Sequence, residues 1–124
     1  MKISIITATY NSARTIKDTL QCIAEQSYPH IEHIIIDGLS KDDTLQNVKQ
    51  FSHVTQLVCE KDKGIYDAMN KGIALASGEV VGILNSDDVY INNSVIGKVM
   101  ERLSRSAIDT NAVPPLGSPP KAAA

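Results

Sequence analysis

The clearest chemical signal in the sequence is a pair of adjacent carboxylates, Asp87 and Asp88, which follow the apolar run Val80–Leu84. Two carboxylates about 4 Å apart repel each other by ~4 kcal/mol at an effective dielectric constant near 20. A divalent cation relieves that repulsion, and Mg²⁺ or Mn²⁺ prefers hard oxygen ligands that it shares with substrate phosphates. Taken alone, such a pair is more often an acidic turn or a helix cap, so its interpretation depends on its neighbours.

Polar residues with matching chemistry follow three other apolar runs. They are Thr9, Tyr10 and Asn11 after the first run, Asp37 after the second, and Asp62 and Lys63 after the third. Asp37 suits a hydrogen bond to a ribose or a base, although an Asx turn explains it as well. Tyr10 either stacks on a base or covers a strand edge. Lys63 meets a phosphate or is simply solvated, and Asn11 can cap the helix that follows it.

The four apolar runs are rich in β-branched residues and are predicted to be strands that are covered on both faces. They are Ile3–Ile6, Ile34–Ile36, Val54–Cys59 and Val80–Leu84. Residues with helical spacing alternate with them. The predicted helices are Ala13–Gln26, a short helix containing Leu45, Val48 and Phe51, a helix from Ile65 to Ala76, and a last helix over about Ser94–Leu103.

This β-α alternation predicts an α/β fold: a Rossmann-like, open, mainly parallel sheet with flanking helices and right-handed crossovers. The carboxyl ends of parallel strands lie at one edge of a sheet, where ligands bind. The polar residues above are therefore expected to share one crevice.

The composition changes after the last predicted helix. Residues 104–124 show no periodicity and contain four of the five prolines, so we expect a disordered Pro/Ala-rich tail. Residues 1–103 form the predicted domain, and its sheet appears truncated after the fourth strand.

Composition excludes several classes of protein. Hydrophobic residues make up 43% of the 124 residues, charged residues 21%, and the net charge is −2, which favours neither nucleic acid nor an anionic surface as a partner. No apolar stretch approaches the ~18 residues of a membrane span. Cys22 and Cys59 lack metal-ligand spacing and are expected to be buried in a reducing compartment. We therefore expect a cytoplasmic location.

Common nucleotide-binding motifs are absent. No GxxxxGK[ST] occurs, which argues against a P-loop NTPase, and no GxGxxG follows the first predicted strand, which argues against a dinucleotide-binding domain. A receiver-like or other flavodoxin-type binding module has the same β-α order. Acidic residues would then be expected after the first strand, and residues 7–11 contain none.

Three stretches, Ser4–Asn11, Ile36–Thr44 and Glu60–Asp88, together resemble the nucleotide-binding half of a family-2 glycosyltransferase with the GT-A fold. The segment from Gly64 to Ala74, followed by Leu84–Asp88, is similar to bacterial enzymes of exopolysaccharide or O-antigen synthesis, including the colanic acid type. The resemblance covers about Met1–Leu103.

The resemblance implies that the donor is a nucleotide-diphosphate sugar, linked to UDP. It also implies an inverting, metal-assisted transfer to a glycan or lipid-linked acceptor in surface polysaccharide biosynthesis. The implied nucleotide-binding residues are Thr9, Tyr10, Asn11, Asp37, Asp62 and Lys63, and the implied ligands of Mn²⁺ or Mg²⁺ are Asp87 and Asp88. It leaves open a peripheral association with the inner face of the membrane and indicates no oligomeric state.

The sequence departs from the family pattern at several positions. Asn85 stands where the acidic motif often begins with Asp, Leu39 stands where glycine is usual, and Met69 stands where many relatives have arginine. The acceptor half and the catalytic base of relatives lie downstream of the acidic motif, so no catalytic base is assigned. The alternative is a catalytically silent, truncated fragment that at most binds nucleotide.

Overall fold

The computed structural model describes residues 1–109 and 122–123, and it confirms the predicted open parallel sheet with flanking helices. The strands are β1 (Ile3–Thr9), β2 (Ile31–Asp37), β3 (Val54–Cys59), β4 (Val80–Ile83) and β5 (Ala122–Ala123). The helices are α1 (Ile16–Ala24), α2 (Thr44–Lys49), α3 (Ile65–Leu75) and α4 (Val95–Asp109).

The boundaries of several elements differ from the prediction. β1 and β2 extend to Thr9 and Asp37, because the polar residues at these ends still pair in the parallel ladder. α4 continues to Asp109, so residues 104–109 are helical where a tail was predicted. Ala122–Ala123 also lie in that predicted tail, yet they pair with Val80 and Val81 as β5; residues 110–121 and 124 lie outside the described part.

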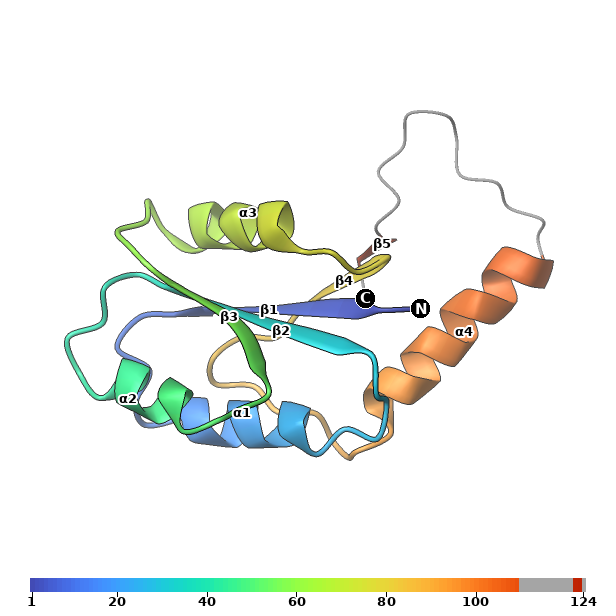
Figure 1. Ribbon diagram of the computed structural model, residues 1–124, viewed down its shortest axis with the longest axis horizontal. Helices are drawn as coiled ribbons and strands as arrows, with labels where there is room; N and C mark the ends of the chain where they lie inside the picture. Colours follow the sequence, from blue (N-terminus) through green and yellow to red (C-terminus); the bar gives the residue numbers. More distant parts are fainter. Residues whose placement is uncertain (110–121, 124) are drawn as a thin grey trace.

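The helices form a layer on each face of the sheet. α1 and α2 lie on one face, α3 lies on the other, and α4 extends from the end of the sheet where β1 begins (Figure 1). Alternation along β1 explains this arrangement: Ile3 and Ile5 pack in one cluster with Ile23 of α1, whereas Ile6 packs with Ala68 of α3. Both faces of the central strands are therefore buried.

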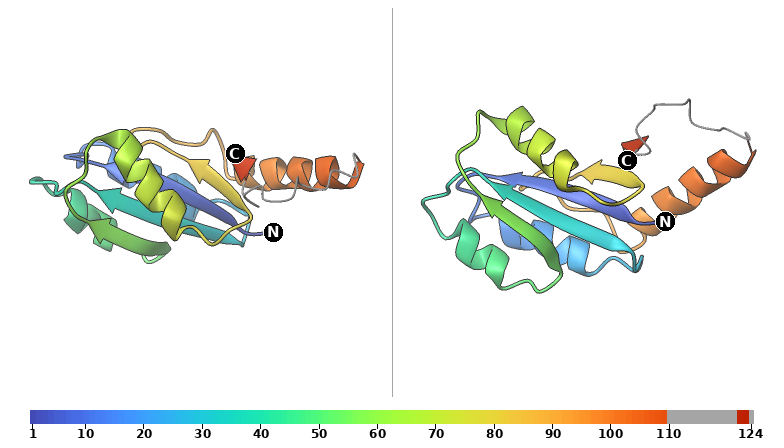
Figure 2. Two further views of the ribbon diagram at one scale, coloured as in Figure 1. Left: turned by 90° about the horizontal axis from the view of Figure 1, so that it is seen from above. Right: turned by 45° about the horizontal axis from the view of Figure 1, so that its top comes forward.

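The strand order is β3-β2-β1-β4-β5, so the direction of the winding reverses at β1. Figure 2 shows β1 between β2 and β4, with α3 crossing the sheet. Right-handed crossovers through α1 and α2 move the chain to one side of β1 along one face. The crossover through α3 returns it along the other face to β4. Such a reversal leaves a gap between adjacent strand ends, which is where open α/β sheets bind ligands.

The cysteines differ from their predicted burial. Cys22 is half-buried, and Cys59 is exposed because it is the last residue of β3, which lies at the edge of the sheet. Within the described residues, no helix is long and apolar enough to cross a membrane.

His33 is a fully buried polar residue in β2. Its Nε2 lies 2.9 Å from Thr7 Oγ1 and its Nδ1 lies 3.1 Å from His53 Nε2. Burial, together with the neighbouring His53, lowers the pKa of His33 from 6.5 to about 3. The imidazole is therefore neutral in the folded protein and serves packing.

We predict that this histidine makes stability fall between pH 7 and pH 5. The unfolded chain binds a proton at His33 below about pH 6.5, and the folded chain does not. The free energy of unfolding then falls by up to ~1.4 kcal/mol per pH unit as the pH decreases. Urea denaturation of the wild type and of His33→Gln at several pH values measures this slope. An equal slope in the two proteins would contradict the prediction.

A second prediction concerns the contact between α3 and β1. A Cβ at Gly72 would lie 2.4 Å from Ile6 Cγ2. Because Ile6 is buried and β-branched, Gly72→Ala should lower the free energy of unfolding by about 1–3 kcal/mol. A Cβ added at Gly97 of α4 would meet no neighbouring atom within 4 Å among the described residues. Gly97→Ala should therefore raise the free energy of unfolding by about 0.5–1 kcal/mol. Denaturant unfolding measures the change in the free energy of unfolding for each variant. Equal changes in Gly72→Ala and Gly97→Ala would contradict the prediction.

Candidate donor-binding site

Two adjoining hollows open at the carboxyl edge of the sheet, where the strand order reverses. The first, the Asp87 hollow, has a volume of about 450 Å³. It is lined by Ala8, Asn11, Ser12, Arg14, Thr15, Ile65, Asn85, Ser86 and Asp87. These residues follow β1 and β4 and begin α3, so the hollow lies at the predicted position between strand ends.

The second, the Asp62 hollow, has a volume of about 340 Å³. It is lined by Ala8, Thr9, Tyr10, Ser12, Asp62, Gly64, Ile65, Ala68 and Ser86. The two hollows share Ala8, Ser12, Ile65 and Ser86. They therefore form one continuous surface with Asp87 on one side and Tyr10 and Asp62 on the other.

The loop that carries Asp87 is held by α1. Thr15 Oγ1 donates to the carbonyl of Ser86 at 2.8 Å, and Thr19 Oγ1 lies 2.7 Å from the carbonyl of Asp88. Ser12 Oγ donates to Ser86 Oγ at 3.0 Å. These contacts use the hydroxyls and carbonyls of the loop and leave its carboxylates free. Neither Asp87 nor Asp88 makes a side-chain hydrogen bond or ion pair in the described part of the chain.

Asp37 is placed differently from the other predicted site residues. It is fully buried and lines neither hollow. Its carboxylate accepts hydrogen bonds from Thr9 Oγ1 at 2.6 Å, from Ser40 Oγ at 2.6 Å and from the Ser40 N–H at 2.8 Å. Cys59 Sγ lies 3.5 Å from it. These are the contacts of the turn that the sequence left as an alternative, and they fix the loop after β2 against the end of β1.

Asn11 also joins the loops after β1 and β2. It does not cap α1, although a cap was predicted from the sequence. Its N–H donates to Ser40 Oγ at 2.8 Å, and its Oδ1 accepts from the N–H of Lys41 at 2.8 Å. Asn11 has a φ of 48°, a left-handed conformation that asparagine tolerates better than most residues. α1 begins only at Ile16, with Thr15 at the cap position.

A second pair of contacts fixes the same two loops. Asp42 accepts hydrogen bonds from Thr44 Oγ1 and from the N–H of Ala13, and the Ser12 N–H donates to Thr44 Oγ1 at 2.7 Å. The Thr44 hydroxyl in particular holds the pKa of Asp42 below its usual value. The rim of both hollows is therefore rigidly hydrogen-bonded.

The loop after β3 is fixed by charge. Lys71 Nζ lies 3.2 Å from a Glu60 carboxylate oxygen and 3.5 Å from one of Asp67, and the Lys63 N–H donates to Asp67 at 2.9 Å. That N–H, and then the charge of Lys71, lower the pKa of Asp67. Asp62 accepts from the N–H of Gly64 at 3.0 Å, and Gly64 has a φ of 112°, which favours glycine.

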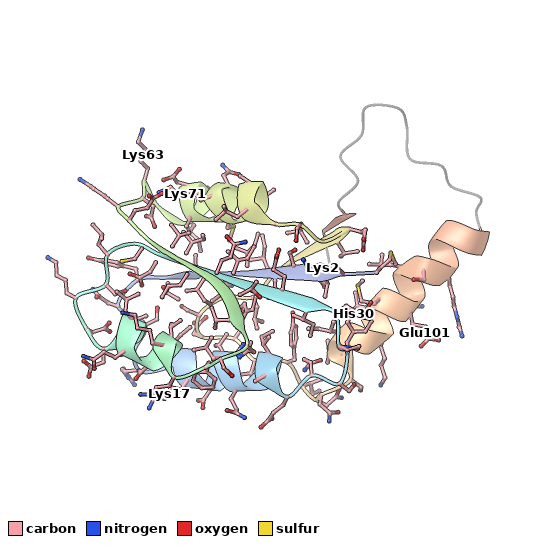
Figure 3. The ribbon with its side chains drawn as sticks, viewed as in Figure 1. Lys2, Lys17, His30, Lys63, Lys71 and Glu101 are labelled. Atoms are coloured by element: carbon pink, nitrogen blue, oxygen red, sulfur yellow. The ribbon has the colours of Figure 1, made fainter. Side chains whose placement is uncertain are left out.

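The structure brings together five of the eight predicted site residues and separates three. Thr9, Tyr10 and Asp62 line one hollow and Asn11 and Asp87 line the other. Asp37 is buried, Asp88 is exposed outside both hollows, and the side chain of Lys63 points away from the molecule (Figure 3).

Sequence reasoning missed Arg14, which lines the Asp87 hollow. Its signal in the sequence was weak, because a single arginine before a helix is usually solvated. Only its nearness to the loop after β4, which is distant in the sequence, distinguishes it.

The oxygen ligands at Asp87 and Asp88 fit a cation that is shared with a substrate. Asp87 lines the first hollow together with Asn85, and their side-chain oxygens are hard donors; the exposed Asp88 carboxylate follows Asp87 in the same loop, outside the hollow. No group of three or more His, Cys, Asp or Glu residues that could hold a metal occurs among residues 1–109 and 122–123. The remaining ligands would have to be phosphate oxygens and water, which is the usual way Mg²⁺ is held beside a nucleotide.

The architecture and the position of the hollows define a GT-A fold, and comparison with solved structures agrees. The chain is similar to Staphylococcus aureus TarS 1–349 in complex with UDP-GlcNAc, with a TM-score of 0.78 and 30% identity over 85% of this chain and 32% of TarS 1–349. It is also similar to the mannosyltransferase PcManGT from Pyrobaculum calidifontis in complex with GDP-Man and Mn²⁺, with a TM-score of 0.77 and 28% identity over 83% of this chain and 32% of PcManGT.

Sequence comparison identifies the family. Residues 4–116 match the family model for glycosyl transferase family 2. The putative teichuronic acid biosynthesis glycosyltransferase TuaG of Bacillus subtilis (strain 168) is 32% identical over 108 residues, which cover 84% of this chain and 43% of TuaG. The chain belongs to glycosyl transferase family 2, as its motifs predicted. It spans about two fifths of the length of the curated relatives it matches.

We predict that Asp37 stabilises the site more than any exposed carboxylate of the same loop. Asp37→Ala would leave the buried hydroxyl of Thr9 without its acceptor and should lower the free energy of unfolding by about 1.5–3 kcal/mol. The matched control is Asp43→Ala, because Asp43 is exposed and makes no side-chain cap bond; its effect should stay within about 0.5 kcal/mol. Urea denaturation compares the two, and similar effects would contradict this role.

Proposed function

We propose that this chain forms the donor-binding part of a glycosyltransferase of surface polysaccharide biosynthesis. Its donor is a sugar linked to a nucleoside diphosphate, UDP. One observation carries the proposal. Two adjoining hollows at the reversal of strand order present an aromatic and largely apolar surface on one side and the unpaired Asp87 carboxylate on the other. A nucleoside diphosphate has two matching parts: a flat base with its ribose, and an anionic diphosphate that a divalent cation would join to the carboxylate.

Relatives support the choice of donor and acceptor. The TarS structures contain UDP-GlcNAc or UDP, and PcManGT contains GDP-Man with Mn²⁺. WfgD of Escherichia coli, 34% identical over 75% of this chain and 38% of WfgD, is a UDP-Glc:α-D-GlcNAc-diphosphoundecaprenol β-1,3-glucosyltransferase. A lipid-linked or glycan acceptor and a cytoplasmic location at the inner membrane face follow as part of the same proposal.

The Asp62 hollow is the proposed nucleoside site. Tyr10, 60% exposed, offers a ring face to a base, and Ile65 and Ala68 provide apolar contact. Asp62 retains a second carboxylate oxygen for a ribose hydroxyl after its bond to Gly64. Asp37 acts through the loop that it fixes, by holding Thr9 and Ser40 in place. A nucleotide contact by Lys63 stays a prediction.

The Asp87 hollow is the proposed diphosphate site. Asp87 and Asp88 are the residues that would hold a divalent cation, Mn²⁺ or Mg²⁺, and the cation would supply positive charge to the departing diphosphate. Asn11, Ser12 and Thr15 line the same hollow, and the side-chain amide of Asn11 carries N–H donors for phosphate oxygens. Ser12 and Thr15 also hold the Asp87 loop in place.

The proposed reaction is a single inverting displacement. The oxygen of an acceptor hydroxyl attacks the anomeric carbon from the side opposite the phosphate, and the bond from that carbon to the phosphate oxygen breaks. The nucleoside diphosphate leaves with the electron pair, and the hydroxyl proton passes to a general base. The residues described here prepare the donor for this step by fixing its nucleoside and its diphosphate in the adjoining hollows.

We predict that metal-dependent UDP binding requires Asp87. By isothermal titration in Mn²⁺, Asp87→Asn should raise the Kd for UDP at least about tenfold, because a neutral amide is a poorer cation ligand. The matched control is Glu101→Gln, which removes one exposed charge from α4 at the opposite end of the molecule and should leave the Kd unchanged (Figure 3).

Two outcomes would contradict the proposal: no Mn²⁺-dependent UDP binding by the wild type, or equal binding by wild type and Asp87→Asn. Transfer of a labelled sugar from a UDP-sugar to a lipid-linked or glycan acceptor, with release of UDP, is a separate measurement. It distinguishes an active transferase from a silent fragment that only binds nucleotide.

A further inference from the structure

Two opposite charges line the Asp87 hollow without pairing. Arg14 lies in the exposed turn between β1 and α1, and Asp87 lies in the loop after β4. Among the described residues, the Arg14 guanidinium makes no hydrogen bond or ion pair, with Asp87 or with any other side chain. A cation and an anion thus face one cavity of about 450 Å³ with their charges unused.

The backbone on both sides of the hollow is held by hydrogen bonds. On the Arg14 side, the N–H of Ala13 donates to Asp42 at 3.1 Å, and Asn47 Nδ2 donates to the carbonyl of Ala13 at 3.3 Å. On the Asp87 side, Thr15 and Thr19 hold the carbonyl of Ser86. The two charged side chains therefore extend from loops whose backbone is already fixed.

A ligand can satisfy both charges only if it carries anionic oxygens for the arginine and can share a cation with the carboxylate. Arginine matches a phosphate group especially well, because its planar guanidinium donates two parallel hydrogen bonds to two phosphate oxygens. Arg14 lines the Asp87 hollow and is absent from the Asp62 hollow, which we assign to the nucleoside. It therefore lines the hollow that we assign to the diphosphate and not the hollow that we assign to the nucleoside.

We propose that Arg14 binds the second phosphate of the donor and makes the site selective for nucleoside diphosphates over nucleoside monophosphates. This inference rests on the proposed function. From the sequence, Lys63 was the candidate for the positive charge that contacts a phosphate, but its side chain points away from the molecule (Figure 3). Arg14 supplies that positive charge in its place.

The test compares binding of UDP and of UMP, each titrated in Mn²⁺ into the wild type, Arg14→Gln and Arg14→Lys. Arg14→Gln should weaken UDP binding about tenfold and UMP binding less than about twofold. Arg14→Lys keeps the charge but loses the bidentate geometry, so its UDP affinity should lie between those of the wild type and Arg14→Gln.

The matched control is Lys17→Gln, which removes an exposed cation from α1, three positions along, on the side facing away from the sheet (Figure 3). It should change neither affinity by more than about twofold, since Lys17 lines neither hollow. If Lys17→Gln lost as much UDP affinity as Arg14→Gln, the change in net charge would explain both losses, and the inference would be overturned.

The remaining outcomes separate this inference from the proposed function. If the wild type binds UDP with Mn²⁺ and Arg14→Gln keeps the same ratio of UDP to UMP affinity, the inference alone fails. If the wild type binds neither nucleotide, both fail. Urea denaturation of Arg14→Gln should match the wild type within about 0.5 kcal/mol, because Arg14 is exposed and has no partner in the described part of the chain.

Discussion

The parallel pairing of β4 with β1, on the side of β1 away from β2, is the constraint on which the site depends. Right-handed crossovers place α1 and α2 on one face and send the chain back through α3 on the other. The ends of β1 and β4 then lie side by side, and Thr15 and Thr19 bind the loop that follows β4. The two hollows lie at these ends, between that loop, the loop after β1 and the start of α3, which is why residues far apart in the sequence share them.

The loops around this space are fixed by hydrogen bonds to hydroxyls and carbonyls, by the carboxylates of Asp37 and Asp42 and, after β3, by the ion pairs of Lys71. Asp37 holds the loop after β2, and the hydroxyls of Thr15 and Thr19 hold the loop after β4 through its carbonyls. These contacts satisfy the backbone and leave the carboxylate of Asp87 and the guanidinium of Arg14 unpaired. Such preorganisation reduces the ordering cost when a ligand binds, because the loops are already in place.

The apolar and the charged side chains occupy different parts of this continuous surface. The Asp62 hollow combines a tyrosine ring with small and branched apolar side chains, and the Asp87 hollow carries the two free charges. This division matches the two halves of a nucleoside diphosphate and agrees with membership of glycosyl transferase family 2.

The sequence by itself determined the order of strands and helices, the α/β class and the polar residues at each strand end, because hydrophobic periodicity and turn chemistry are local properties. Its motifs also identified the family. Only the tertiary structure decided which of those polar residues face the hollows. Asp37 is buried, Lys63 points outward, and Arg14 faces the hollow, because the direction of a loop side chain depends on hydrogen bonds between loops that are distant in the sequence.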